Sequence, residues 1–143
     1  MTDLVSRARD LAYRAHAGQV DKAGRPYIEH VARVAAAVSD DPIAEAVAWL
    51  HDVLEDCPDP DVFNEVSEFP EDIFWAVWTL TRPKDDGSDR YYVYVQLDPL
   101  ALRVKLADIA DNADEARLAL LDKATADRLR RKYAKAQAAL GVE

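Results

Sequence analysis

The sequence predicts an all-α fold, a single domain over residues 1–143 that forms a bundle of about seven or eight helices. Apolar residues recur at helical spacing in most segments. Aspartate–proline pairs supply an N-cap followed by proline in the first turn. The one strand-like run, residues 91–97, has no second such run to pair with. Half of the residues are apolar, and no repeat or linker divides the chain, so we expect one core.

The first two helices are predicted by their apolar faces. Residues 4–15 place apolar side chains on one side, and a polar loop over 19–25 follows Gly18. Pro26 suits the first turn of the next helix, which reaches about Val38.

The third helix begins at Asp41 and Pro42, where the aspartate acts as the cap. It runs to about Asp56, because Pro58 and Pro60 follow. The remaining expected elements are helices over 61–68, 70–80, 91–97 and 99–113, a charged loop over 82–89, and a last helix that Thr125 caps and Gly141 ends.

The composition limits the classes of partner. Lys and Arg total 18 against 27 Asp and Glu, a net charge of −9, which disfavours a nucleic-acid polymer as ligand. The nearest basic cluster, Arg128, Arg130, Arg131 and Lys132, has the spacing of a solvated helix face. No apolar run is long enough to cross a membrane, and no secretory signal is visible. We therefore expect a soluble cytoplasmic protein with no membrane partner.

Four side chains point to a metal site. His30, His51, Asp52 and Asp108 follow or interrupt apolar stretches of three expected helices, and buried ionisable groups are costly unless they are paired or bound to metal. Cys57 is the only cysteine, so any metal must take nitrogen and oxygen ligands. One divalent cation satisfies all four side chains, and manganese, iron, zinc and magnesium fit such ligands.

Simpler explanations exist for each of these residues taken alone. His51-Asp52 can be a surface cap, His30 a core histidine, and Asp108 a hydrogen-bonding partner of Asn112 one turn later. Their joint occurrence in separate helices favours the metal. His16 ends the first helix before a glycine, and we expect it to be structural or to support a ligand.

The motifs around these residues resemble a known family. The order His…His-Asp…Asp is similar to that of HD-domain metal-dependent phosphohydrolases. The flanking segments resemble the hydrolase domain of RelA/SpoT-type proteins and the small alarmone hydrolases, which remove the 3′-pyrophosphate of (p)ppGpp using manganese. The resemblance extends from about Leu4 to Leu140, and four segments support it: 15–19 (AHAGQ), 24–30 (GRPYIEH), 49–56 (WLHDVLED) and 104–108 (VKLAD).

The resemblance implies roles for individual residues. The four side chains named above would be the ligands of one divalent ion, most often Mn²⁺, with Mg²⁺, Fe²⁺ or Zn²⁺ as alternatives. The acidic pair Glu55 and Asp56 would lie near the attacking water and take its proton. Asn112 and Tyr133 would contact a small nucleotide substrate.

Phosphate charge and base recognition are less closely matched. Lys22, with Arg14, Lys105 or Arg128, would neutralise the phosphates. Asp21 stands where the alarmone hydrolases usually carry an arginine that packs on guanine, and Leu129 stands where an arginine is common. Asp21 would repel a nearby phosphate, so Asp21→Arg is expected to improve turnover if an alarmone is the substrate.

Other functions stay open at this point. The substrate can be another phosphorylated metabolite or nucleotide, or the chain can be a non-catalytic nucleotide-sensing module. A third class is an interaction protein or homo-oligomer with tryptophans at its interface. Helical spacing instead places Trp49, Trp75 and Trp78 in the core.

Overall fold

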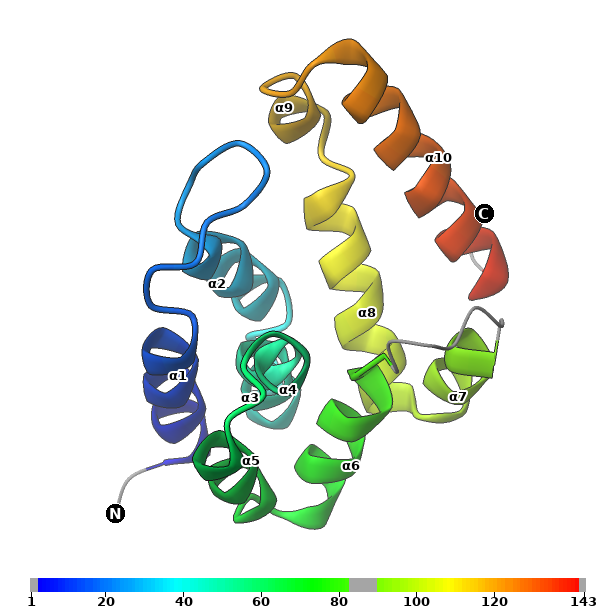
Figure 1. The fold of residues 1–143 in the computed structure, drawn as a ribbon. Coiled ribbons are helices and arrows are strands. Elements are labelled where there is room, and N and C mark those ends of the chain that lie inside the picture. The colour runs from blue at the N-terminus through cyan, green and yellow to red at the C-terminus, as the bar shows by residue number, and fades with distance from the viewer. Residues whose placement is uncertain (1–2, 83–89, 142–143) are drawn as a thin grey trace.

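The predicted all-α fold is confirmed. A computed structural model of the chain describes residues 3–82 and 90–141; within them 73% helix and no strand is found, apart from an isolated bridge between Val20 and Pro26. Figure 1 shows the helices in chain order. They are α1 (Leu4–Ala15), α2 (Tyr27–Ala37), α3 (Pro42–Leu50), α4 (Val53–Asp56), α5 (Pro60–Ser67), α6 (Glu71–Leu80), α7 (Arg90–Leu97), α8 (Pro99–Asn112), α9 (Glu115–Leu118) and α10 (Lys123–Ala139).

An aspartate cap followed by proline fixes the start of three helices. The carboxylates of Asp41, Asp59 and Asp98 each accept a hydrogen bond from the backbone N–H two residues later, at 2.9–3.0 Å. In each case proline follows in the first turn, where its missing N–H costs nothing. Each such cap stabilises its helix by about 1 kcal/mol.

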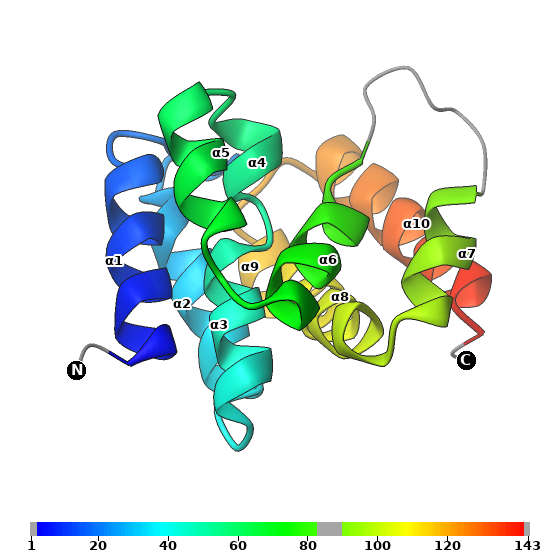
Figure 2. The same ribbon diagram turned by 90° about the horizontal axis from the view of Figure 1, so that it is seen from below.

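Two helices occupy the centre of the molecule. α8 packs against α2, α3, α6, α7 and α10, and α3 packs against α1, α2, α6 and α8. Figures 1 and 2 show α8 between two groups of helices, with α1–α5 on one side and α7 and α10 on the other. Their shared core includes Leu11, Leu50, Ile73 and Ile109, all essentially inaccessible to solvent. This packing brings the C-terminal half of α8 beside the start of α2 and the end of α3.

A second, smaller cluster joins α9 to α10. Leu118 packs with Ala126 and Leu129, and partly buried Leu121 and Tyr133 lie against them. This cluster places α9 beyond the C-terminal end of α8, and α10 then runs back beside α8 toward α7 (Figure 1).

Several sequence expectations were wrong. The helix expected over 42–56 is broken at His51 and Asp52 into α3 and α4. α10 begins at Lys123 under an Asp122 cap rather than at Thr125, because Asp122 accepts the Thr125 N–H at 2.8 Å.

The tryptophans divide differently from the expectation, and one short helix was not expected. Trp49 is buried, but Trp75 and Trp78 are 55% and 50% exposed, so two of the three core assignments fail. Both lie on the outer side of α6, where they contact Phe74 rather than the core.

The short helix α9 was not predicted, because four residues are too few to show a helical periodicity.

The other elements follow the expectation. Residues 91–97 are helical, with Tyr91 and Val95 buried, and the charged loop expected over 82–89 lies, beyond Arg82, outside the described residues. No helix in the described ranges combines the length and apolarity that a bilayer crossing requires.

Candidate metal centre

The four predicted ligands converge. His30, His51, Asp52 and Asp108 each offer one ligand atom, and these atoms all lie within 4.8 Å of one another. α2 supplies His30, α8 supplies Asp108, and the junction between α3 and α4 supplies the adjacent pair. Both histidines and Asp108 are buried, and Asp52 is partly buried. The cluster can therefore hold a metal ion.

The break in the third helix lets two adjacent residues reach one point. Successive side chains of an α-helix point about 100° apart, which would separate His51 from Asp52. Here the His51 Nδ1 atom donates to the Ala48 carbonyl at 2.6 Å, the carbonyl that would accept the Asp52 N–H in a continuous helix. The chain turns, and Asp52 Oδ2 comes to lie 3.1 Å from His51 Nε2.

The hydrogen bonds of the two imidazoles orient their free nitrogens. His51 Nδ1 donates a hydrogen bond to the Ala48 carbonyl, and His30 Nδ1 forms one with the Asp111 carboxylate, both at 2.6 Å. The opposite nitrogens then face the same oxygen, Asp108 Oδ1, at 2.9 Å from His30 and 3.3 Å from His51. In neutral rings these Nε2 atoms carry lone pairs. Two lone pairs and a carboxylate require a cation between them, so the donor set fits a metal ion.

Without a metal, protons supply this cation. Burial alone would lower the pKa of His51, but Asp52 and Asp108 raise it well above its ordinary value. Burial likewise opposes the rise at His30, yet hydrogen bonds to Asp108 and Asp111 raise its pKa. Burial would raise the pKa of Asp108, but the two imidazoles hold it well below its ordinary value.

Further donors surround the two carboxylates. The Tyr27 hydroxyl donates to Asp52. Lys105 Nζ donates to Asp108 Oδ2 and Asn112 Nδ2 to Asp108 Oδ1, both at 3.2 Å. These contacts fix the orientation of both acids, and they assign Asn112 a place beside a ligand.

The acidic pair lies on α4, and its two members have different surroundings. Glu55 Oε1 accepts the Arg82 N–H at 2.7 Å, and Glu55 lines the same cavity as Asp52. Asp56 Oδ2 accepts from Gln19 Nε2 at 3.1 Å and is not among the described residues that line the cavity. Partial burial, with Asp52 nearby, raises the pKa of both carboxyls.

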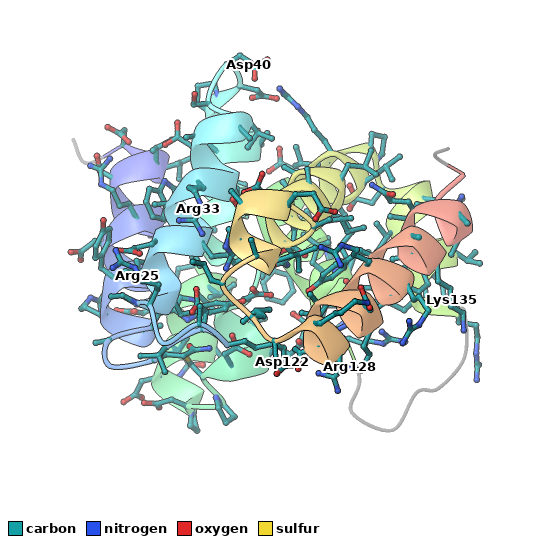
Figure 3. All side chains as sticks on the ribbon, turned by 90° about the horizontal axis from the view of Figure 1, so that it is seen from above. Arg25, Arg33, Asp40, Asp122, Arg128 and Lys135 are labelled. Atoms are coloured by element: carbon teal, nitrogen blue, oxygen red, sulfur yellow. The ribbon has the colours of Figure 1, made fainter. Side chains whose placement is uncertain are left out.

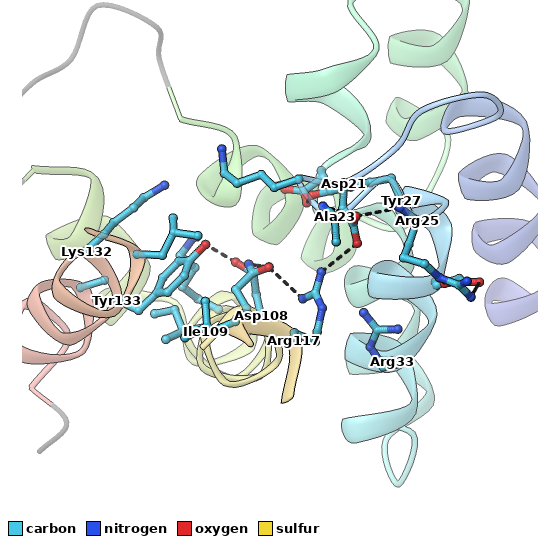
Figure 4. A pocket seen from close by; sticks show the side chains of 18 of the residues that line it. Asp21, Ala23, Arg25, Tyr27, Arg33, Asp108, Ile109, Arg117, Lys132 and Tyr133 are labelled. Atoms are coloured by element: carbon cyan, nitrogen blue, oxygen red, sulfur yellow. Dashed lines mark hydrogen bonds and ion pairs between the residues drawn. The ribbon is translucent and has the colours of Figure 1, made fainter. Parts of the chain in front are cut away.

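A cavity of about 590 Å³ opens beside the cluster. Figure 4 shows Asp108 and Tyr27 within it, with Lys132 and Tyr133 reaching it from α10. All three predicted substrate contacts, Lys22, Asn112 and Tyr133, line it. Its other lining residues include six basic and several apolar side chains. They are Arg25, Arg33, Arg82, Lys105, Arg117 and Lys132, and among the apolar ones Ile109, Leu118, Leu121 and Leu129.

Two basic residues proposed for phosphate lie elsewhere. Arg14 pairs with Glu65 at 3.3 Å on α5. Arg128 projects from the outer side of α10, as does Lys135 (Figure 3). Neither Arg14 nor Arg128 is among the described lining residues, whereas Lys22 and Lys105 do line the cavity.

The surroundings of Asp21 differ from the expectation. Its Oδ1 atom accepts the N–H groups of Ala23 and Arg25, both at 2.9 Å, and its Oδ2 atom pairs with Arg117 Nη2 at 3.2 Å. Burial would raise the pKa of Asp21, but these contacts lower it. The carboxylate is thus a paired charge of the loop, and an Asp21→Arg variant would lose all three of these contacts.

Sequence reasoning missed Asp111, Arg33 and Arg117. Asp111 contacts His30 and both arginines, and despite partial burial its pKa is lowered to about 2 by these contacts. The spacing offered one signal, because Asp111 follows Asp108 by three residues and Arg33 follows His30 by three.

The expectation for His16 fits the structure. His16 is buried, its Nδ1 atom lies 2.8 Å from Gln19 Oε1, and it is not part of the four-residue cluster. Gln19 in turn donates a hydrogen bond to Asp56.

No family model matches the sequence.

Proposed function

We propose that the chain is a metal-dependent phosphohydrolase of the HD-domain type, acting on a nucleotide. The substrate we propose is (p)ppGpp, from which the enzyme removes the 3′-pyrophosphate. The observation that carries the proposal is the position of the ligand cluster, whose four atoms lie within 4.8 Å of one another beside a cavity of about 590 Å³ that is lined by seven basic and five acidic side chains. The motif resemblance to RelA/SpoT-type hydrolases supports the choice of substrate.

Four cations that line the cavity favour a ligand with several negative charges. Lys22, Arg82, Lys105 and Lys132 all line the cavity. Burial lowers the pKa of Lys132, and the charges of Lys105, Lys22 and Arg82 lower it further. These cations therefore repel one another, and a pyrophosphate group would relieve the repulsion.

Apolar residues that line the same cavity suit the rest of a nucleotide. Leu118, Leu121 and Leu129 provide an apolar surface, and Tyr133 lies beside it. The cavity volume is in the range of small-molecule sites, which are mostly apolar with a few placed polar groups. A base packed on this surface would leave its phosphates directed toward Lys105 and the ligand cluster.

The chain supplies a proton acceptor next to the cluster. A bound divalent ion, Mn²⁺ in this proposal, would polarise a phosphoryl oxygen and lower the pKa of water toward about 7. Glu55 lines the cavity, and its raised pKa suits a group that takes a proton from the attacking water. Asp56, which accepts a hydrogen bond from Gln19, adds to the effect of burial a negative charge that raises the pKa of Glu55.

A product-release screen tests the function. Purified protein is assayed for phosphate and pyrophosphate release from a nucleotide panel that includes ppGpp, with Mn²⁺, with Mg²⁺ and after chelation. We expect pyrophosphate from ppGpp with Mn²⁺, and no turnover after chelation or in Asp108→Ala and His51→Ala. Glu71→Gln, which removes an exposed charge from α6, is the matched control and should keep full activity.

Each other outcome has a definite meaning. Release from a different phosphorylated compound would keep the phosphohydrolase and replace the substrate. Binding of ppGpp without release would make the chain a nucleotide-sensing module. Turnover by Asp108→Ala after chelation would overturn the metal mechanism.

A further inference from the structure

The strongest unassigned feature is a carboxylate on the far side of a ligand. Asp111 does not belong to the four-residue cluster. It faces His30 Nδ1 at 2.6 Å, whereas His30 Nε2 faces Asp108 Oδ1 at 2.9 Å. The imidazole thus lies between two carboxylates that have different neighbours.

Two arginines hold Asp111 in place. Arg33 Nε donates to Asp111 Oδ1 at 2.7 Å, and Arg33 Nη2 donates to Oδ2 at 3.3 Å. Arg117 Nη1 donates to Asp111 Oδ2 at 2.8 Å and to the Asp111 carbonyl at 3.1 Å. The two guanidinium groups hold the carboxylate where its Oδ2 atom can accept a hydrogen bond from His30 Nδ1.

Arg117 also contacts the loop that lines the cavity. Its Nη2 atom pairs with Asp21 Oδ2 at 3.2 Å, and Asp21 binds two backbone N–H groups of that loop. Figure 4 shows the Arg117 guanidinium reaching the Asp21 carboxylate, with Arg33 close by. The contacts therefore form a chain from the cavity loop through Arg117 and Asp111 to His30.

We propose that Asp111 is a positioning residue: held by Arg33 and Arg117, it keeps the His30 proton on Nδ1 and so directs the Nε2 lone pair at the metal. Arg117 makes this orientation depend on the cavity loop. Carboxylates that accept the second N–H of a ligating histidine commonly contribute 10–100-fold to metal affinity. The proposal rests on the metal site of the proposed function, but on no substrate.

The test measures zinc binding rather than turnover. Zn²⁺ is diamagnetic, and the chain has only three histidines, so ¹⁵N-histidine NMR can follow each ring. In the Zn²⁺-loaded wild type we expect His30 to carry its proton on Nδ1, protected from exchange. Asp111→Ala should lose that protected signal and bind Zn²⁺ 10–100-fold more weakly by competition with a chelating dye.

Two further variants make the result specific. Arg117→Gln keeps the Asp111 side chain but removes one of the two arginines that hold it, and it should weaken Zn²⁺ binding several-fold. This variant keeps the test decisive if Asp111→Ala does not fold. Glu115→Gln, which removes a charge that pairs with Arg130 at the surface, is the control and should match the wild type. Asp111→Glu should recover part of the lost affinity.

The possible failures are distinguishable. An unchanged Zn²⁺ affinity and an unchanged His30 signal in Asp111→Ala and Arg117→Gln would overturn the positioning role alone. A wild-type chain that binds no Zn²⁺ would overturn the metal site and this inference together. Zn²⁺ binding as expected, with no phosphohydrolase activity on any nucleotide, would overturn only the proposed function.

Discussion

Removing one ligand, Asp108, should abolish a metal-dependent gain in stability that does not depend on any substrate. A ligand that binds only the folded state stabilises it by RT ln(1 + [M]/Kd), about 2.7 kcal/mol at one hundred times Kd. The chain has 143 residues, so its unfolding entropy at the midpoint is about 0.3 kcal/mol per kelvin. Saturating Mn²⁺ should therefore raise the Tm of the wild type by about 9 °C.

The Asp108→Asn variant should show no such shift. Asp108 Oδ1 is the oxygen that both Nε2 atoms face, at 2.9 and 3.3 Å. The amide keeps the shape of the side chain but removes its charge. Differential scanning calorimetry with and without Mn²⁺, after chelation of carried-over metal, measures the effect, and Glu71→Gln serves as the control. A full shift of about 9 °C in Asp108→Asn would refute the assignment of this cluster as the metal site.

Three other outcomes follow from the same structure. The pKa values of His30 and His51 are raised when no metal is bound, so protons compete with the metal for these side chains. The affinity for Mn²⁺ should therefore rise with pH, and binding should release protons. Calorimetric titration in buffers of different ionisation enthalpy measures both effects, and the opposite trend would contradict this expectation. The raised pKa values also mean that metal-free stability is highest below about pH 6.5 with respect to these two groups and falls as pH rises through their folded pKa values, which urea titrations at several pH values measure. Leu50 is fully buried, whereas Trp75 is 55% exposed. Leu50→Ala should therefore lower the free energy of unfolding by about 3 kcal/mol, and Trp75→Ala should lower it by less than about 0.5 kcal/mol. Urea unfolding measures both values, and equal decreases would contradict the assigned core.

Local patterns predicted most of the helices well, because caps and apolar periodicity act within a few residues. Asp41, Asp98 and Gly141 mark ends that the structure confirms. The errors lie where local signals compete. Asp122 and Thr125 both suit an N-cap, and only the hydrogen bonds made in the folded chain show which residue caps α10.

The candidate site shows the same division. The residue types and their order identified His30, His51, Asp52 and Asp108, since an ionisable side chain in an apolar helix needs a partner. The break at His51, however, depends on an imidazole that binds the Ala48 carbonyl, and no local pattern indicates that competition.

The sequence by itself therefore determined the helices, the ligand types and the exclusion of a thiolate site, because each depends on residues close together in the chain. Tertiary structure alone decided that three helices meet at one point, that Asp21 is paired with Arg117, and that Asp111 lies behind His30. These contacts join residues 57–96 positions apart. Their distances are set by the packing of α2, α8 and α9 around the core, which periodicity along one helix does not encode.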